Sequence, residues 1–322
     1  MKAIYHDQFG PPDVLELRDL DPPTAGPGEV LVEVHAAGVN PGDRHAIRGV
    51  PYAARLIGYG LTKPKQRVPG IDLAGRIAAV GQGVTRFELG DEVFGWATGT
   101  FAQYATASQH SLEPKPGRLT FEQAAAVPTA GFAALQALRN VGQTEAGHHV
   151  LVIGASGGVG TFAVQIAKAF GAEVTGVAGT RNIELVRSAG ADRVIDYSVE
   201  DFTRSDDRYD QVIDLVGHAR LSVASRVLTT GGTYVVVGGQ NPDSITGMGR
   251  FATAVVLSPI LRRRIRPLFS KPSHDDLSAL ARLLESGKVL PVIDATYDLN
   301  GVVDALRYVE AGHTRGKVVL TI

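Results

Sequence analysis

The sequence contains no cysteine among its 322 residues. Disulfide bonds, thiol nucleophiles, iron–sulfur clusters and thiolate zinc sites are therefore excluded. An excess of charge of one sign is also missing, because 32 Lys and Arg stand against 33 Asp and Glu, for a formal net charge of -1. Such a balance provides no overall field that would attract nucleic acid or anionic lipid, so any partner must be recognised locally.

Long hydrophobic runs are absent as well. No stretch approaches the roughly 18 uncharged apolar residues of a membrane span, and the opening residues MKAIYHDQFG lack the apolar core of a signal peptide. We therefore expect a soluble cytoplasmic protein that neither spans a membrane nor binds nucleic acid. The chain is long enough for two domains, each with its own core.

Two sequence patterns divide the chain. The first third consists of short β segments separated by Gly and Pro, and the period of two in EVLVEVH favours a barrel-like β domain. From about Phe121 an Ala-rich helical segment leads into apolar strands that alternate with helices: HVLVIGA, EVTGVAG, RVIDY, QVIDLVG and TYVVVGG. This alternation predicts a parallel sheet wrapped by helices. The apolar segment TYVVVGG is a candidate for the sheet edge, which a second copy of the chain would cover in a homodimer.

The strongest local signal is a glycine-rich turn between an apolar strand and a helix, with Gly154, Gly157, Gly158 and Gly160 in the passage HVLVIGASGGVGTFAVQIAKAFG. Glycines let the backbone approach a pyrophosphate, which the free N–H groups and the positive end of the following helix stabilise. The strand–turn–helix–strand context predicts dinucleotide binding, and a purely structural turn is the alternative.

The second strand of this unit ends in GVAGTRN, without the acidic residue that holds the ribose 2′-hydroxyl of NAD. Thr180 and Arg181 offer a hydroxyl and a guanidinium for the additional phosphate of NADPH. The sequence therefore predicts NADPH as the preferred cofactor, and a solvated arginine at a helix start is the alternative reading.

The glycine loop, the segments AAGVNPGD and VPGIDLAGRIAAVG and the final RGKVVLTI occur in an order that resembles the medium-chain dehydrogenase/reductase superfamily. More narrowly, the chain looks like the zinc-independent quinone oxidoreductase branch, related to zeta-crystallin. The resemblance implies an α/β fold in which a Rossmann doubly wound parallel sheet is inserted in a GroES-like β-barrel domain. We expect the GroES-like catalytic domain at residues 1–122 and 268–322, and the Rossmann NADPH-binding domain at 123–267.

The resemblance also implies roles for individual residues. On the cofactor side it points to residues of the pyrophosphate loop, the 2′-phosphate region, the nicotinamide end and the ends of two further strands: Gly157, Gly158, Val159, Gly160, Thr180, Arg181, Tyr197, Thr129, Gly217, Val237, Gly238 and Gly239. On the substrate side it points to Asn40 and Tyr52, with Asp43 and Arg48 close by. Simpler structural alternatives remain for several of them: Asp43 is a natural N-cap, Arg48 has the option of a surface carboxylate partner, and Thr129 that of a helix cap.

A catalytic metal is not expected. Zinc alcohol dehydrogenases of the superfamily have a metal-binding cysteine where this chain has Asn40, and a His–Glu pair at Ile71 and Asp72. Asn and Ile are not credible replacements for Cys and His as zinc ligands.

The expected function is the transfer of a hydride from NADPH to a quinone or an α,β-unsaturated carbonyl compound. Reduction of an enoyl thioester and non-catalytic NADPH binding are the alternatives. The apolar and basic segment from Arg250 to Lys271 is interrupted by Pro259, and we expect it to form a loop and helix that cover the cleft or a subunit interface.

Overall fold

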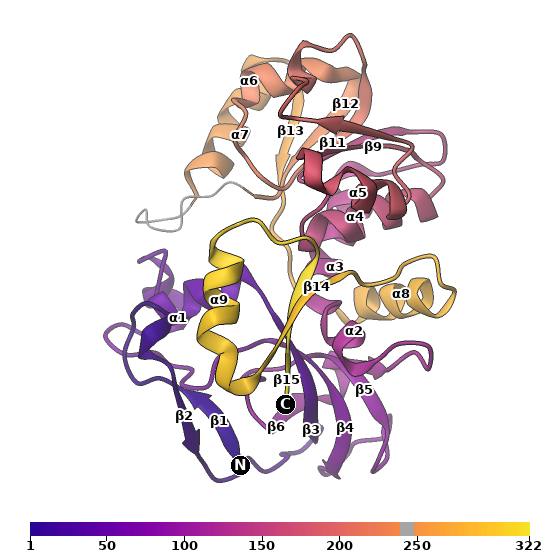
Figure 1. Cartoon of the computed structure of the whole chain (residues 1–322). Coiled ribbons are helices and arrows are strands. Elements are labelled where there is room, and N and C mark those ends of the chain that lie inside the picture. Colours follow the sequence, from indigo (N-terminus) through magenta and orange to yellow (C-terminus); the bar gives the residue numbers. More distant parts are fainter. Residues whose placement is uncertain (239–247) are drawn as a thin grey trace.

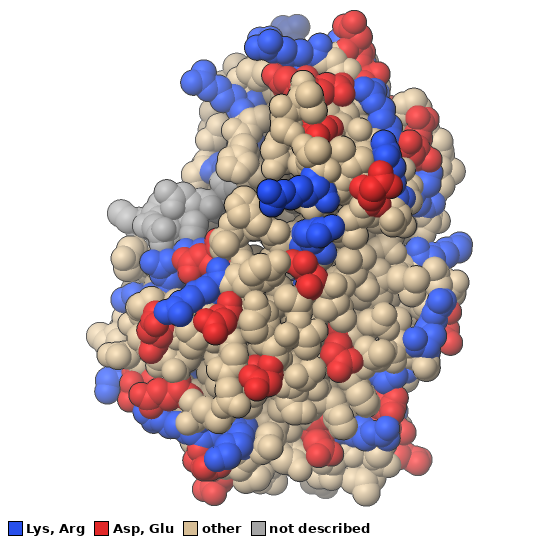
Figure 2. All heavy atoms as spheres, in the orientation of Figure 1, with Lys and Arg blue, Asp and Glu red and all other residues tan. Residues whose placement is uncertain are grey.

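The structure is a computed structural model that describes residues 1–238 and 248–322. Its fold is built around two large β-sheets. Figure 1 shows them in two halves of the molecule, with the late strands β14 and β15 lying among the elements formed by the start of the chain. The helices α2 and α3 lie between the halves. On the face shown in Figure 2, acidic and basic side chains are interspersed over both halves, as expected from the balanced composition.

The parallel sheet has the strand order β10-β9-β8-β11-β12-β13, which is the order of the Rossmann fold. Its strands in chain order are β8 (His149–Ile153), β9 (Glu173–Ala178), β10 (Arg193–Asp196), β11 (Tyr209–Asp214), β12 (Leu228–Val236) and β13 (Arg264–Pro267). Nearly every residue of β8 is buried, because helices cover both faces of the sheet. The helices of this half are α4 (Gly158–Ala169), α5 (Ile183–Ser188), α6 (Leu221–Ala224) and α7 (Gly249–Ile260).

One sequence-based expectation about this sheet is wrong. The segment TYVVVGG is not at the edge, because β12 pairs with β11 on one side and with β13 on the other. The edge strand is the short, arginine-rich β13, whose sequence RIRP carries too little apolar signal to predict a strand. Pro259 lies in the last turn of α7, and the helix ends one residue later at Ile260.

The second sheet is mainly antiparallel, with the order β14-β15-β3-β4-β5-β7 and with β6 paired to β3. Its strands are β3 (Glu29–Val39), β4 (Asp72–Val80), β5 (Glu92–Trp96), β6 (Tyr104–Ser108), β7 (Leu112–Pro114), β14 (Ile293–Asp298) and β15 (Lys317–Thr321). A separate hairpin joins β1 (Lys2–Tyr5) and β2 (Glu16–Asp19). The remaining helices are α1 (Pro41–Arg48), α2 (Phe121–Ala125), α3 (Pro128–Leu135), α8 (His274–Glu285) and α9 (Val302–Glu310).

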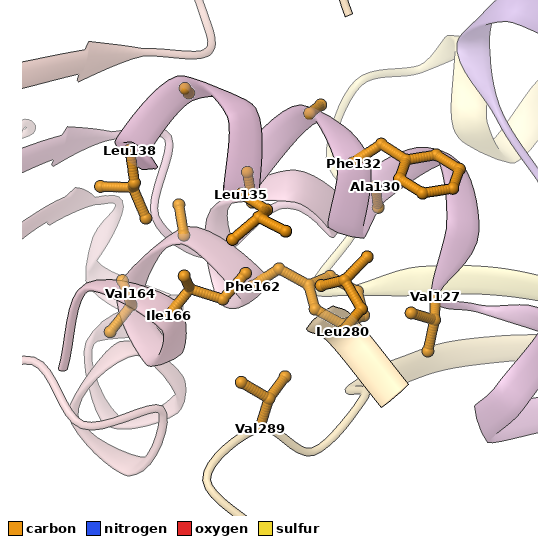
Figure 3. Close-up of a cluster of buried hydrophobic side chains, with 14 of the residues drawn as sticks. Val127, Ala130, Phe132, Leu135, Leu138, Phe162, Val164, Ile166, Leu280 and Val289 are labelled. Atoms are coloured by element: carbon orange, nitrogen blue, oxygen red, sulfur yellow. The ribbon is translucent and has the colours of Figure 1, made fainter. Parts of the chain in front are cut away.

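Three clusters of buried side chains form the core. One lies within the antiparallel sheet, and one lies between the parallel sheet and the helices α6 and α7. The third connects α3, α4 and α8 and reaches into both sheets (Figure 3). In it Phe162 of α4 and Leu280 of α8 pack close to Leu135 of α3. Because this cluster is continuous between the sheets, it fixes the two halves against each other where the site lies.

Candidate active site

The glycine loop lies at the carboxyl end of β8, beside β11, where the strand order of the parallel sheet reverses. Gly154 has a left-handed backbone with φ of 85°, and the N–H groups of Gly154 and Ala155 both donate to the carbonyl of Val177 at 3.1 Å. A Cβ on Gly160 would lie 2.1 Å from the oxygen of Gly154, so only glycine fits there. The loop is thus held in one shape by the neighbouring strand.

The start of α4 is open to a ligand. Its N-cap, Gly157, makes no side-chain capping hydrogen bond. A Cβ on Gly157 would have only one neighbour, the oxygen of Gly154 at 3.5 Å, so that the approach to this backbone is not blocked. Uncapped N–H groups at the positive end of a 12-residue helix fit a pyrophosphate, and Gly158, Val159 and Gly160 are where the sequence predicts it.

The predicted 2′-phosphate region follows β9. Thr180 and Arg181 are exposed, and Tyr197 is 66% exposed beside Gly179. Asn182 ties this turn to the glycine loop, because its Nδ2 donates to Oγ of Ser156 at 3.2 Å.

An acidic residue that sequence reasoning missed belongs to this region. The hydroxyls of Thr180 and Ser198 lie 2.8 Å apart, and Ser198 donates to Asp196. These hydroxyls lower the pKa of Asp196, with Ser198 making the largest contribution and Thr180 the next. A carboxylate close to Thr180 opposes a phosphate there, so the predicted preference for NADPH would depend mainly on Arg181.

The carboxyl ends of β11 and β12 lie on the other side of the point where the strand order reverses, opposite the glycine loop. Buried Asp214 accepts hydrogen bonds from the N–H groups of Val216 and Gly217 at 3.2 and 2.8 Å, and its own carbonyl accepts from Val237 and Gly238. A Cβ on Gly238 would lie 1.9 Å from the oxygen of Leu215. Gly217, Val237 and Gly238 therefore line the carboxyl ends of these strands, as predicted, whereas Gly239 lies outside the described residues.

Two further side chains, from β12 and α7, hold the carboxylate of Asp214. Its Oδ2 accepts from Tyr234 Oη at 2.9 Å and from Nη2 of Arg250 at 2.5 Å. Arg250, at the start of α7, thus connects this helix to the end of β11.

On the facing side of the junction lies a polar group that we call the Asn40 cluster: Asn40, Asp43, Asp72, Thr129 and Lys317. All of them are buried except Thr129, which is half-buried. Strand register brings its members together. Strand β3 lies between β4 and β15, with Gly38 opposite Asp72 and Val39 opposite Val318. Asn40, which follows β3, therefore lies between the first residue of β4 and the first residue of β15.

Hydrogen bonds connect the Asn40 cluster internally. Asn40 Nδ2 donates to Asp72 Oδ2 at 2.9 Å, and Lys317 Nζ donates to Asn40 Oδ1. Thr129 donates to Asp72 from its backbone N–H at 3.1 Å and from Oγ1 at 2.6 Å. The backbone N–H of Asn40 donates to Asp43 Oδ2 at 2.8 Å, so Asp43 completes a capping box of α1 as its third helical residue, whereas the N-cap itself is Asn40 and not Asp43 as its alternative reading had it.

Burial dominates the electrostatics of this cluster. It raises the pKa of Asp72 and lowers that of Lys317, against their mutual attraction across 4.0 Å. Burial, followed by the charge of Asp72, raises the pKa of Asp43 to about 7. Since its Oδ1 has no hydrogen-bond partner among the described residues, Asp43 is the carboxyl in which a proton is best accommodated.

Tyr52 and Arg48 lie outside this cluster. The Tyr52 ring is 52% exposed and lies against the guanidinium of Arg55, whose carbon is 5.1 Å from the ring centre. Arg48 pairs with Glu310 of α9 at 3.1 Å, which is the surface carboxylate partner of its alternative reading. The structure thus brings Asn40, Asp43 and Thr129 together, together with two residues that sequence reasoning did not select for the site, Asp72 and Lys317.

The residues present do not fit a metal ion. The sequence has no cysteine, and within residues 1–238 and 248–322 no three His, Asp or Glu side chains are placed to hold one. The Asn40 cluster already contains a cation, because the ammonium group of Lys317 lies 4.0 Å from Asp72 and also acts electrostatically on Asp43.

Comparison with known proteins agrees with this architecture. Residues 26–117 match the model of the alcohol dehydrogenase GroES-like domain, and residues 189–320 match a model described as zinc-binding dehydrogenase. Over its full length the chain is 33% identical to human quinone oxidoreductase and covers 98% of that protein. The chain belongs to the medium-chain dehydrogenase/reductase superfamily. Within it, the chain belongs to the zinc-independent quinone oxidoreductase branch, and the prediction of a Rossmann sheet combined with a GroES-like domain is confirmed.

Other members of the superfamily are similarly related. The chain is 34% identical to the mouse mitochondrial NAD(P)H oxidoreductase RTN4IP1, with all of this chain and 89% of the relative covered. It is also 34% identical to tomato 2-methylene-furan-3-one reductase, covering 99% of the chain and 79% of the relative. Among solved structures, the quinone oxidoreductase from Coxiella burnetii has a TM-score of 0.85 at 33% identity, covering 100% of this chain and 99% of that one. A mycobacterial protein solved with NADPH has a TM-score of 0.84 at 25% identity, and both chains are covered completely.

Proposed function

We propose that this protein transfers a hydride from NADPH to a quinone or an α,β-unsaturated carbonyl compound without a metal. One observation carries the proposal: the glycine loop of the parallel sheet and the Asn40 cluster meet directly. A Cβ on Gly158 would lie 3.0 Å from Cδ of Lys317, whose amino group binds Asn40. A dinucleotide held by its pyrophosphate at this loop extends its nicotinamide half toward the cluster.

The choice of NADPH is supported by exposed Arg181 and by the lack of an acidic residue directly after β9. Tyr197, beside Gly179, provides an aromatic wall to the same region. The names of relatives support a nicotinamide cofactor, since one is an NAD(P)H oxidoreductase and another was solved with NADPH.

The chemistry suits an acceptor that is already electrophilic. Bound NADPH supplies the hydride, and the charge that develops on the acceptor oxygen is met by hydrogen-bond donors of the protein. We assign this role to the second N–H of the Asn40 amide, whose contact to the carbonyl of Gly38 is long at 3.4 Å, and to the Tyr52 hydroxyl. Orientation of the two reactants supplies much of the rate, and the proton is taken from water.

An assay of NADPH oxidation with a panel of quinones, enones and enoyl thioesters tests the proposal, with EDTA present in one arm. We expect quinone or enone reduction that EDTA does not change, and little oxidation of ethanol by NADP. Alcohol oxidation abolished by EDTA would contradict the mechanism. Turnover of enoyl thioesters alone would favour the thioester reductase alternative, and cofactor binding without turnover would favour a binding protein.

The proposal also covers the domain boundaries, the oligomeric state and the cellular location. We assign residues 1–122 and 268–322 to the catalytic domain and 123–267 to the cofactor domain. We propose a homodimer formed along the β13 edge, supported by the exposed apolar side chains Val255, Val256 and Ile260 on neighbouring α7. None of the described helices is long and apolar enough to cross a membrane. We also propose a cytoplasmic location, in contrast to the relatives that are named mitochondrial.

A further inference from the structure

Lys317 is the residue of the site to which neither the sequence nor the proposed chemistry assigns a task. Its side chain is only 4% exposed, and its amino group contacts Asn40 Oδ1, the carbonyl of Val39 at 3.3 Å and, more distantly, Asp72. Burying an ammonium group is costly unless it is paired and hydrogen-bonded. An apolar residue at the start of β15 would serve the sheet equally well, so the charge itself needs an explanation.

The partners of Asn40 determine which way its amide points. Lys317 has only donors and therefore requires the amide oxygen, whereas ionised Asp72 has only acceptors and requires the amide nitrogen. A flipped amide would place Nδ2 against an ammonium and Oδ1 against a carboxylate. The two charges thus select one of the two orientations, and they hold it from opposite sides.

This arrangement leaves one amide hydrogen with a weaker partner. The first N–H of Asn40 binds Asp72 at 2.9 Å, and within the described part of the chain the second has only the 3.4 Å contact to the carbonyl of Gly38. An ammonium on the amide oxygen withdraws electron density from the nitrogen, so it also makes the second N–H a stronger donor.

The stem of Lys317 adds a mechanical connection. Its Cγ and Cδ lie against Gly158 at the start of α4, and its backbone N–H donates to the carbonyl of Val292 at 2.8 Å. The same side chain therefore touches the loop predicted to hold the pyrophosphate and the amide predicted to serve the reacting end.

We propose that Lys317 is a positioning residue for hydride transfer, which with Asp72 holds the Asn40 amide in the orientation that presents its second, weakly bonded N–H to the reacting end of the site. The inference rests on the proposed function only where it assigns Asn40 to that end. Lys317 itself does not touch the substrate. The effect of its charge on hydride transfer passes through Asn40.

A double-mutant cycle in the full-length protein tests this mechanism. Lys317→Met removes the charge and keeps the stem, and we expect it to lower kcat by tenfold or more with a change of less than threefold in KM for NADPH. Because hydride transfer then limits turnover, the primary isotope effect with NADPH deuterated at the transferred position should increase. In an Asn40→Ala background the same change should cost less than twofold. An equal loss in both backgrounds would overturn the proposal.

The control variant is Lys115→Met. Lys115 is also a buried lysine, with a side chain 5% exposed that donates to the carbonyl of Leu119 at 2.7 Å, but it pairs with Glu92 away from the site. It should leave kcat and the isotope effect unchanged. Asp72→Asn provides a second route if Lys317→Met does not fold, because it removes the negative charge that selects the amide nitrogen on the other side of Asn40, and its effect on kcat should be smaller in the Asn40→Ala background.

A binding measurement separates this inference from the proposed function, since it needs no turnover. NADPH titrations followed by fluorescence should show that the effects of Lys317→Met and Asn40→Ala on affinity are coupled. 2′-Phospho-ADP-ribose, which lacks the nicotinamide, should bind the wild type and Lys317→Met equally. Equal weakening of both ligands would assign Lys317 to the pyrophosphate and overturn the positioning role, whereas failure to reduce any acceptor would overturn only the proposed function.

Discussion

Charge is unbalanced in the Asn40 cluster, because Asp43 and Asp72 share a single ammonium, that of Lys317. The titratable groups that act on Asp43 are Asp72 from β4, Lys317 from β15 and Tyr59, the last residue of the short helical segment Arg55–Tyr59. The pKa of Tyr59 is raised by burial and by the charge of Asp43. A proton on Asp43 removes the excess negative charge, and this couples the stability of the protein to pH.

We predict that Asp43→Asn removes a pH dependence of stability. The folded-state pKa of Asp43 is raised from 3.8 to about 7, so the folded state holds a proton that the unfolded state releases. The free energy of unfolding of the wild type therefore decreases as the pH rises through this window, by up to about 4 kcal/mol. Above pH 7 the variant should be more stable than the wild type. Urea unfolding at several values between about pH 5 and pH 8 measures this difference.

Asp91→Asn is the control for that experiment. Asp91 also accepts a backbone hydrogen bond three residues away, from Glu88 at 2.8 Å, but it is exposed. Its substitution should leave the pH dependence unchanged. A wild type and an Asp43→Asn variant with parallel stability profiles would contradict the assignment of the proton to Asp43.

A second prediction at this scale concerns cofactor choice. A charge-assisted bond to the 2′-phosphate contributes about 1.5 to 3 kcal/mol, so Arg181→Glu should weaken NADPH binding roughly tenfold to a hundredfold and NADH binding much less. Asp196→Asn should act in the opposite direction, because it removes a negative charge near Thr180. Titration of each variant with both cofactors measures these effects.

Arg187→Glu provides the comparison, since Arg187 is an exposed arginine of α5 that pairs with Glu184 instead. Equal affinity of the wild type for NADPH and NADH would remove the argument for Arg181.

The sequence indicates Asn40 and Thr129 but not the residues that hold them. Asp72 in GIDLAG and Lys317 in RGKVVLTI have the appearance of ordinary polar residues at strand starts, where exposure is the usual outcome. Only the register of β15 and β4 on either side of β3 brings them to Asn40, across sequence separations of 277 and 32 residues. A single sequence contains no information about that register.

At the scale of elements, two glycines of the loop before α4 have different roles: Gly160 allows close packing of the backbone, and Gly157 leaves the approach of the pyrophosphate open. Gly160→Ala should disrupt the loop, because its Cβ would lie 2.1 Å from the oxygen of Gly154 and the backbone must shift. We expect a melting temperature lower by several degrees and loss of NADPH binding. Thermal unfolding and cofactor titration measure both effects.

Gly157→Ala tests the loop without this clash. Gly157 has an ordinary φ of -78°, and its Cβ would have only a contact of 3.5 Å. The melting temperature should therefore stay within about a degree or two, while a methyl group on the face open to the pyrophosphate weakens NADPH binding. A variant that binds NADPH as tightly as the wild type would show that the pyrophosphate does not contact this face.

Elements with a regular apolar pattern were predictable, and those with an irregular pattern were not. The segment DDLSALARLLESG predicts the helix observed as α8, and the strands β8 to β12 follow the apolar segments. The strand β13 was missed, because three of its four residues are Arg or Pro and it gains its backbone partners only from β12. Because β13 adds one strand beyond β12, the edge of the sheet lies one strand further out than the predicted edge at TYVVVGG.

At the scale of the molecule, the proposed dimer gives the last prediction. Val256 is 59% exposed on α7, and we expect Val256→Glu to produce a monomer at micromolar concentration, because a charge there would be buried in the interface. Light scattering measures the mass of each variant. Val199→Glu is the control, since Val199 is 84% exposed but follows β10 at the opposite edge of the sheet. A monomeric wild type would count decisively against the dimer.

The connection between Asn40 and Lys317 has a consequence for the order of events during synthesis. A ribosome releases Asp43 and Asp72 long before it adds Lys317, which comes 277 residues after Asn40. The nascent antiparallel sheet therefore lacks both β15 and the cation of its polar centre, while β8 to β13 are already complete. Domains generally fold as units during translation, so the parallel sheet can form before the antiparallel sheet, which still lacks β14 and β15. The polar centre of the site can therefore be completed only after β15 has been synthesised, because that strand carries the counter-charge of Lys317.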